Sequence, residues 1–198
     1  MSKKIFEENV PSKQIELLNQ LKHYKISKLV RYSWLPPEEA AKEWSIPLSS
    51  VFCLTAGPLL ITLETNLVIG FSSLPREASI TVWLEKTEKG EQDVDISIEN
   101  DGELYPIDAC DPIYSEKSIC EVLNKQVNSI KILKKKPENI LLAQLPCEAG
   151  LVMEFEGLTL TTKLLLSHGL HDNSDDFAII FNDEIPQNML NQLQEVIV

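Results

Sequence analysis

Residues 59–71 read LLITLETNLVIGF, and this stretch decides the fold. Two apolar runs flank the short polar segment Glu64–Asn66. Runs of this length, separated by a few turn-type residues, are typical of two antiparallel strands joined by a tight connection. We therefore predict a β-hairpin over residues 59–71, in a protein built mainly from antiparallel sheet.

The segment after this hairpin extends the sheet. Within Ser79–Glu85 the apolar residues Ile80, Val82 and Leu84 alternate with a second, more polar set. Such alternation predicts a strand with two different faces. Trp83 lies on the more polar face, and we expect another part of the chain to cover it rather than a ligand.

Working toward the N-terminus, the pattern changes to helices and one strand. Ser12 can cap a helix whose apolar positions are Ile15, Leu18 and Leu21. Residues 29–34 predict a short strand. A proline pair follows, and acidic residues in the next turn favour a helix over residues 38–44.

Working toward the C-terminus, the clearest strand signal lies in Asp93–Glu99, which alternates acidic or polar residues with apolar ones. Asp101-Gly102 is typical of the two-residue turn that joins two strands tightly. Residues 104–108 then predict the returning strand. We therefore expect a second hairpin over residues 93–108.

This hairpin has a defined register if Asp101-Gly102 forms its loop. Ile98 then lies opposite Tyr105 on the buried side, and Asp95 lies opposite Asp108 on the outer side. Like charges directly across a ladder are unfavourable. We expect solvent, a lysine from elsewhere or a partner's cation to lie between them.

The second half again alternates helix and strand signals. Ser115 can cap a short helix that contains Ile119 and Leu123. The strands that we predict are residues 127–133, 151–156, 158–164 and 177–181. Phe177–Phe181 is wholly apolar, which is typical of a central strand covered on both faces. The C-terminal stretch predicts an amphipathic helix that begins at Pro186, with the apolar positions Met189, Leu190, Leu193, Val196 and Ile197.

These elements describe an α+β fold of mainly antiparallel β-sheet or sheets, with an N-terminal helix, a short middle helix and a C-terminal amphipathic helix. A length of 198 residues fits a single domain over residues 1–198. A subdivision into 1–110 and 111–198 stays open. Gly57 and Gly150 each precede a hairpin, a loop and a strand, so two duplicated β-rich halves are a further possibility.

The charge balance restricts the partners. The chain has 30 acidic against 18 basic residues and a net charge of −12. Residues 85–121 alone contain twelve acidic and three basic residues. Such a field repels nucleic acid and anionic membranes and attracts basic surfaces. The lysine-rich first 31 residues fit a solvated helix face or one that lies against the chain's own acidic regions.

Neither the cysteines nor short motifs indicate a cofactor. Cys53, Cys110, Cys120 and Cys147 do not form a C-x-x-C pair and are not near a histidine at zinc-like spacing. We predict four reduced thiols in a cytoplasmic protein without a secretory signal, a membrane span or a cofactor. The chain contains no P-loop, dinucleotide-binding or serine-elbow motif.

The segment 167–176 is the richest in potential metal ligands. Its candidates are His168, His171, Asp172, Asp175 and Asp176. Two histidines and three carboxylates suit a divalent metal, but the spacing does not fit the calcium-binding loop of an EF-hand. An acidic loop that joins two strands explains the same residues, and both interpretations stay open.

In size, acidity and lack of a catalytic signature, the chain resembles bacterial immunity or inhibitor proteins that neutralise basic toxins. The resemblance implies a cytoplasmic protein-binding module rather than an enzyme. The residues that we expect to bind a basic partner are Asp93, Asp95, Glu99, Asp101, Glu103 and Asp108. One alternative is a metal-dependent or acid–base enzyme that uses the segment 168–176. Another is a homo-oligomer in which the C-terminal helix docks on a second copy.

Overall fold

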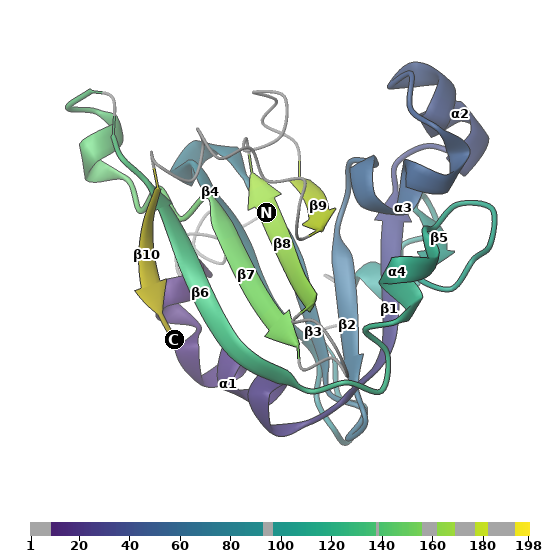
Figure 1. The fold of residues 1–198 in the computed structure, drawn as a ribbon, viewed down its shortest axis with the longest axis horizontal. Helices are drawn as coiled ribbons and strands as arrows, with labels where there is room; N and C mark the ends of the chain where they lie inside the picture. The colour runs from purple at the N-terminus through teal and green to yellow at the C-terminus, as the bar shows by residue number, and fades with distance from the viewer. Residues whose placement is uncertain (1–8, 93–96, 138, 156–161, 169–176, 182–192) are drawn as a thin grey trace.

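Two five-stranded antiparallel sheets and a few short helices make up the fold, which confirms the predicted α+β class (Figure 1). The structure is a computed structural model that describes residues 9–92, 97–137, 139–155, 162–168, 177–181 and 193–198. Figure 1 shows the second sheet on the left, and strands β1, β2 and β5 of the first sheet on the right.

The first sheet has the strand order β4-β3-β2-β1-β5. Its strands are β1 Ile26–Ser33, β2 Leu59–Leu63, β3 Val68–Leu74, β4 Ser79–Lys86 and β5 Tyr105–Asp108. The predicted hairpin over residues 59–71 is confirmed, because β2 and β3 pair with Leu59 opposite Phe71 and Ile61 opposite Ile69. Asn66 has a φ of 69° in the turn, a conformation that asparagine tolerates better than most residues.

The second sheet has the strand order β10-β6-β7-β8-β9. Its strands are β6 Val127–Lys135, β7 Gly150–Phe155, β8 Thr162–His168, β9 Phe177–Phe181 and β10 Leu193–Ile197. Both sheets therefore consist of a four-stranded meander whose fifth strand returns beside the first. The duplication of one β-rich unit stays a prediction.

Short helices fill the connections. They are η1 Pro11–Lys13, α1 Ile15–His23, α2 Pro37–Glu43, η2 Leu48–Ser50, α3 Val51–Leu54, η3 Pro75–Glu77, η4 Ile98–Asn100, α4 Lys117–Cys120 and η5 Leu142–Gln144. The helices predicted near residues 15–21 and 38–44 are thus present. The caps differ from the prediction, because Gln14 and Glu116 occupy the N-cap positions that we expected for Ser12 and Ser115.

The main core lies between the two sheets. One cluster of buried side chains combines Leu29, Leu59 and Ile61 of the first sheet with Ile130 and Met153 of the second. Alternation along each strand sends these residues inward and their neighbours to the outer faces. The outer face of each sheet carries a smaller apolar cluster of its own.

Two predictions about the second sheet are wrong. Residues 177–180 are buried as expected, but β9 lies at the edge of the described sheet rather than in its centre. Leu193–Ile197 forms strand β10 instead of the last turns of a helix. The open side of β6 offers a ladder of hydrogen bonds that outweighs helix propensity, and Val196 and Ile197 are good strand formers. The earlier part of the predicted helix, 186–192, lies outside the described residues.

Candidate partner-binding surface

The segment 97–104 does not form the predicted hairpin. Residues Ile98–Asn100 make the 3-10 turn η4, and β5 pairs with β1 instead, with Ile107 opposite Arg31. The predicted pairing of Ile98 with Tyr105 is therefore wrong, because Tyr105 lies opposite Ser33. Asp108 lies opposite Val30, and Asp95, its predicted partner, lies outside the described residues. Ile107 is needed in the core between the sheets, which draws β5 onto the free side of β1.

Segment 97–104 instead covers the outer face of the first sheet. An apolar cluster on that face contains Val30, Tyr32, Leu60, Val68 and Leu104, with Ile98 and Trp83 packed against it. Ile98 and Leu104 thus anchor the two ends of the segment. In the described part of the alternating pattern, residues 97–99, Ile98 lies in η4 and packs on the face of the first sheet.

Trp83 reaches this cluster because of a glycine on the adjacent strand. Gly70 lies opposite Trp83, and a Cβ atom at Gly70 would lie 2.2 Å from the indole ring. The indole therefore occupies the space of the missing side chain. The expectation that another part of the chain covers Trp83 is confirmed.

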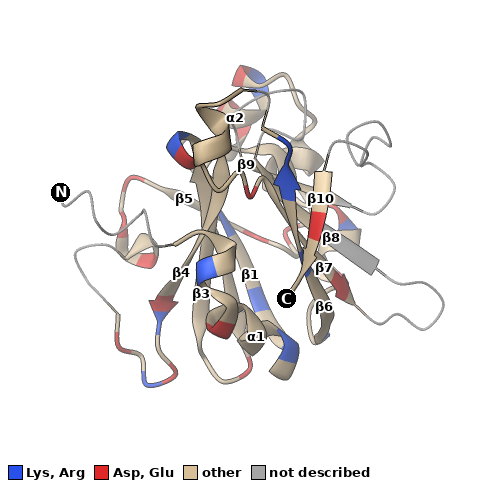
Figure 2. Ribbon diagram, turned by 90° about the vertical axis from the view of Figure 1, so that its left-hand side faces the viewer, with Lys and Arg blue, Asp and Glu red and all other residues tan. Residues whose placement is uncertain are grey.

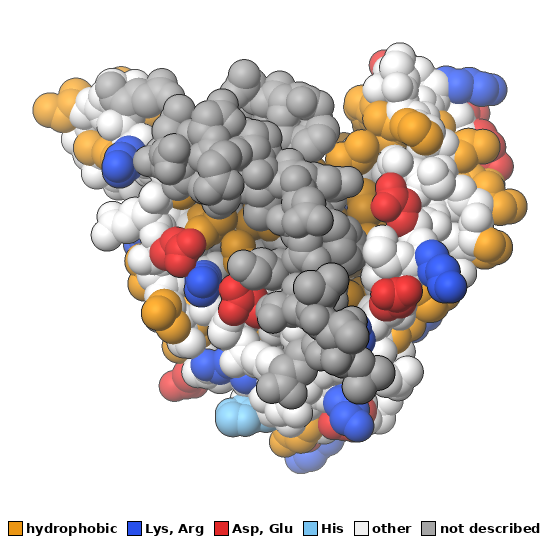
Figure 3. Space-filling model, in the orientation of Figure 1, with side chains coloured by type: hydrophobic (Ala, Val, Ile, Leu, Met, Phe, Trp, Pro, Cys, Tyr) orange, Lys and Arg blue, Asp and Glu red, His pale blue; other side chains and the backbone are white. Residues whose placement is uncertain are grey.

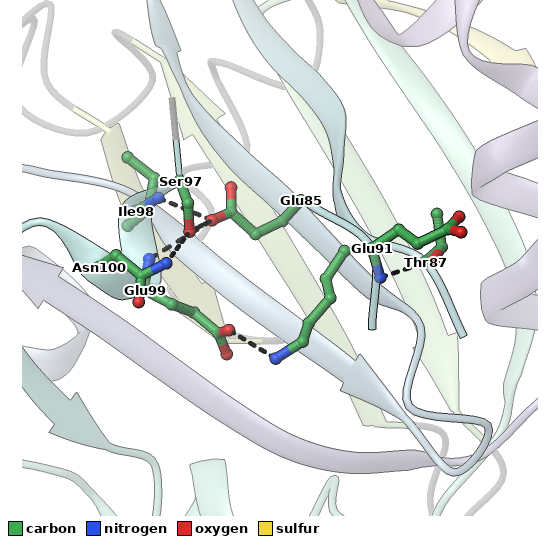
Figure 4. A network of polar contacts seen from close by, with 8 residues as sticks. Glu85, Thr87, Glu91, Ser97, Ile98, Glu99 and Asn100 are labelled. Carbon is green, nitrogen blue, oxygen red and sulfur yellow. Dashed lines mark hydrogen bonds and ion pairs between the residues drawn. The ribbon is translucent and has the colours of Figure 1, made fainter. Parts of the chain in front are cut away.

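Glu85 fixes the segment through a buried carboxylate (Figure 4). Its Oε1 atom accepts hydrogen bonds from Ser97 Oγ at 2.9 Å and from the Ile98 amide at 2.7 Å, and Oε2 accepts one from Trp83 Nε1 at 2.7 Å. The Glu99 amide lies 3.4 Å from Oε1. Glu85 is only 4% exposed, so these donors replace the water that a carboxylate requires.

Two further ionisable groups lie near this network, the Lys86–Glu99 ion pair and the Tyr32 hydroxyl. Lys86 Nζ lies 3.0 Å from the Glu99 carboxylate, and both side chains are partly exposed. Burial raises the pKa of Tyr32 to about 12, and the negative charges of Glu99 and Glu85 act in the same direction. Tyr32 is part of the apolar cluster and therefore stays neutral at physiological pH.

The predicted partner-binding residues have separate fates. Asp93 and Asp95 lie outside the described residues, and Glu99 is engaged by Lys86. Asp101, Glu103 and Asp108 are exposed. Asp101 Oδ1 accepts the Glu103 amide and Asp108 Oδ1 accepts the Cys110 amide, each at 2.9 Å. Among the described residues, none of these three exposed carboxylates takes part in a salt bridge.

A wider acidic region surrounds them. Residues 34–48 and 99–121, which we call the acidic end, contain three plus seven acidic residues, hence ten, against two lysines, Lys42 and Lys117. Elements α2, β5 and α4 of this region lie together on the right of Figure 1, and Figure 2 shows acidic segments on loops beside β4 and β5. A hydrogen bond from Tyr114 lowers the pKa of Glu38 in α2.

The candidate metal ligands are largely outside the described residues, since only His168 of the set lies within them. His168 is buried at the end of β8, and its Nδ1 atom lies 2.6 Å from Ser73 Oγ of β3. This contact joins the two sheets. Within the described ranges no group of three potential ligands is close enough to hold a metal ion, so the metal site stays a prediction.

The cysteine prediction is wrong for two residues. Cys110 and Cys120 form a disulfide that connects the end of β5 to α4, whereas Cys53 and Cys147 are buried thiols. Burial raises the pKa of the Cys147 thiol, which makes it a poor nucleophile. Disulfides persist in oxidising compartments, so the cysteines no longer support the cytoplasmic location, which stays a prediction.

Sequence reasoning also missed Arg31, a buried cation between the sheets. Its guanidinium donates hydrogen bonds to the carbonyl oxygens of Thr55 and Phe177 and lies 4.5 Å from the centre of the Phe177 ring. The alternation in β1 points to a buried position, but only the three-dimensional structure brings Phe177 to it. Arg31 therefore connects β1 with β9.

The comparisons with known proteins add no family. No family model matches the chain, and no curated protein or solved structure is significantly similar to it. In the described part of the chain, the helices are too short or too polar to cross a membrane.

Proposed function

We propose that this chain is a protein-binding module whose acidic end receives a basic surface of another protein. The observation that carries the proposal is the fixation of segment 97–104 by the buried Glu85 carboxylate. A fixed segment presents Asp101 and Glu103 in one arrangement, so binding orders little additional chain. A smaller entropy cost leaves more of the contact energy for affinity.

Charge supports the same direction. Ten acidic residues against two lysines in the acidic end create a negative field that accelerates encounter with a cation-rich partner. Asp101, Glu103 and Asp108 are the carboxylates that we propose contact the partner. Glu99 contributes less, because Lys86 already neutralises it.

The partner that fits best is a basic toxin-like protein, which would make this chain an immunity or inhibitor protein. Size, acidity and the ordered acidic segment favour this function. The test begins with the reading frame immediately upstream of this one. We expect its product to be basic and to arrest growth when it is expressed alone, and co-expression with this chain should restore growth.

The surface is tested with a charge-reversal pair. In the double variant Glu103→Lys/Asp108→Lys, the association rate with that product at low salt should fall about tenfold, because steering is lost. Glu16→Lys on α1 is the control, since it changes the same kind of exposed charge outside the acidic end. An unchanged rate in the double variant would exclude this surface.

A further inference from the structure

Exposed apolar side chains are concentrated in a few places. In the described part of the chain, nine large hydrophobic residues are exposed. Four belong to the acidic end, namely Trp34, Leu48, Tyr105 and Ile113. The three most exposed of the nine are Ile140, at 79%, Ile197, at 77%, and Leu141, at 73%. Apolar side chains that are exposed together often mark an interaction site.

Ile140 and Leu141 lie on a turn that is held by hydrogen bonds. Asn139 Oδ1 accepts hydrogen bonds from the Leu141 and Leu142 amides, both at 3.0 Å. The Ala143 amide donates to the Asn139 carbonyl. The turn therefore holds two aliphatic side chains in water. We call the described residues around it, 134–137 and 139–145, the η5 knob.

The η5 knob is also locally basic. The sequence 134–145 has three lysines and one acidic residue, in a chain whose net charge is −12. Lys134 is engaged by Glu148 at 3.0 Å, which leaves Lys135 and Lys136 beside the apolar turn. Figure 3 shows hydrophobic side chains with a basic one beside them at the upper left, where Figure 1 shows the η5 segment.

The acidic end has the complementary character. It combines exposed apolar side chains with ten acidic residues, and it lies at the opposite side of the molecule in Figure 1. One copy cannot bring its own knob to its own acidic end, because the two sheets lie between them. The complement must come from another molecule.

We infer that the η5 knob of one copy docks on the acidic end of a second copy. Lys135 and Lys136 lie against acidic side chains there, and Ile140 and Leu141 contact exposed apolar ones. The contact joins two different surfaces, so it is heterologous and leads to rings or open chains rather than to a symmetric dimer. This inference rests on the proposed function, because it uses the same acidic end and names a second copy as one of its partners.

Sedimentation of the full-length protein over a range of concentrations tests the inference. We expect wild type to associate, and the knob variant Ile140→Asp/Leu141→Asp and the acidic-end variant Glu103→Lys/Asp108→Lys to stay monomeric. An equimolar mixture of the two variants should form dimers and nothing larger, because each pair retains one intact contact. Leu84→Asp, an exposed aliphatic residue outside both surfaces, is the control and should associate like wild type.

A wild-type protein that stays monomeric, or a knob variant that associates normally, would overturn the inference. So would binding of wild type to phosphatidylserine vesicles that the knob variant loses, if the protein does not associate, because the knob would then be a membrane contact. The proposed function fails separately, if the acidic-end variant still binds the upstream product at the wild-type rate.

Discussion

Glu85 and Glu148 are two buried carboxylates that the protein stabilises with different kinds of partner. In the described part of the chain, the donors to Glu85 are neutral and come from Trp83, Ser97, Ile98 and the Glu99 amide. Glu148, fully buried, receives the Lys134 ammonium at 3.0 Å and the Ser12 amide at 2.7 Å. The two sites therefore differ in the charge of their described partners, which include a cation at Glu148 but not at Glu85.

The difference separates the role in binding that we propose for Glu85 from the structural role of Glu148. Glu148 joins three parts of the chain, since its own amide donates to Ser79 Oγ and its carbonyl accepts the Ile80 amide. It therefore holds η1 and β4 against the second sheet. Glu85 holds a single segment, 97–104, and that segment is the one that carries the acidic side chains.

The largest expected effect comes from the packing that supports Glu85. Gly70→Ala introduces a Cβ atom 2.2 Å from the Trp83 ring, so the indole must move and release both the outer cluster and Glu85. We expect a loss of about 3 kcal/mol in the free energy of unfolding, measured by urea denaturation. Gly102→Ala is the control, since nothing lies within 4 Å of its added Cβ. Equal stabilities of the two variants would show that Trp83 is not tightly packed.

The outer cluster also shows what sequence reasoning achieves. The hairpin over residues 59–71 was predictable because its strands and its turn are contiguous. The alternation in Asp93–Glu99 is equally clear, but it does not reveal whether Ile98 belongs to a new strand or covers another sheet. Glu85 receives its donors from residues 97–98, so its burial depends on a fold that local pattern does not specify.

The C-terminal segment is likewise ambiguous in its local pattern. Leu193–Ile197 fits one helix face and also fits an edge strand, and only the open side of β6 selects the strand. The disulfide between Cys110 and Cys120 has no diagnostic spacing and requires β5 and α4 to meet. Of the six predicted partner-binding residues, Asp101, Glu103 and Asp108 are exposed in the structure without a hairpin to align them.

The ion pair at Glu148 gives the next largest effect. Lys134→Met keeps most of the aliphatic stem but leaves the buried carboxylate without its cation. We expect the free energy of unfolding to fall by about 2 kcal/mol. The fall is smaller than for a fully buried pair, because the Lys134 side chain is 34% exposed. Glu148→Gln in the Lys134→Met background should recover part of the lost stability, since no unpaired charge remains. Additive losses in the double variant would contradict the coupling.

Removing the charge of Glu85 should have a smaller effect. Both carboxylate oxygens of Glu85 accept hydrogen bonds. In Glu85→Gln an NH2 group replaces one of these oxygens, so at least one donor loses its acceptor. We expect the free energy of unfolding to fall by about 1–2 kcal/mol. Hydrogen exchange at the Ile98 amide should accelerate, because its acceptor weakens. Glu91→Gln, an exposed change nearby, should leave that exchange rate unaltered. Unchanged exchange in Glu85→Gln would mean that the segment is fixed by its apolar contacts alone.

The smallest effect is a pH dependence at Tyr32. Its folded-state pKa, about 12, exceeds the ordinary value of 10.0, so above pH 10 the unfolded chain releases a proton that the folded chain keeps. Stability is therefore fully present below pH 10 and falls as the pH rises toward 12, by about 1 kcal/mol between pH 10 and 11. Denaturation of wild type and Tyr32→Phe across this range isolates the contribution of Tyr32 to the pH dependence, because the variant lacks the ionisable group.

The two outer-face carboxylates Glu85 and Glu99 add to the rise in the Tyr32 pKa, so Glu85→Gln should make the decline in stability shallower. A decline of equal steepness in wild type and Tyr32→Phe would mean that Tyr32 ionises as freely in the folded protein as in the unfolded chain, and that the outer face is open to water.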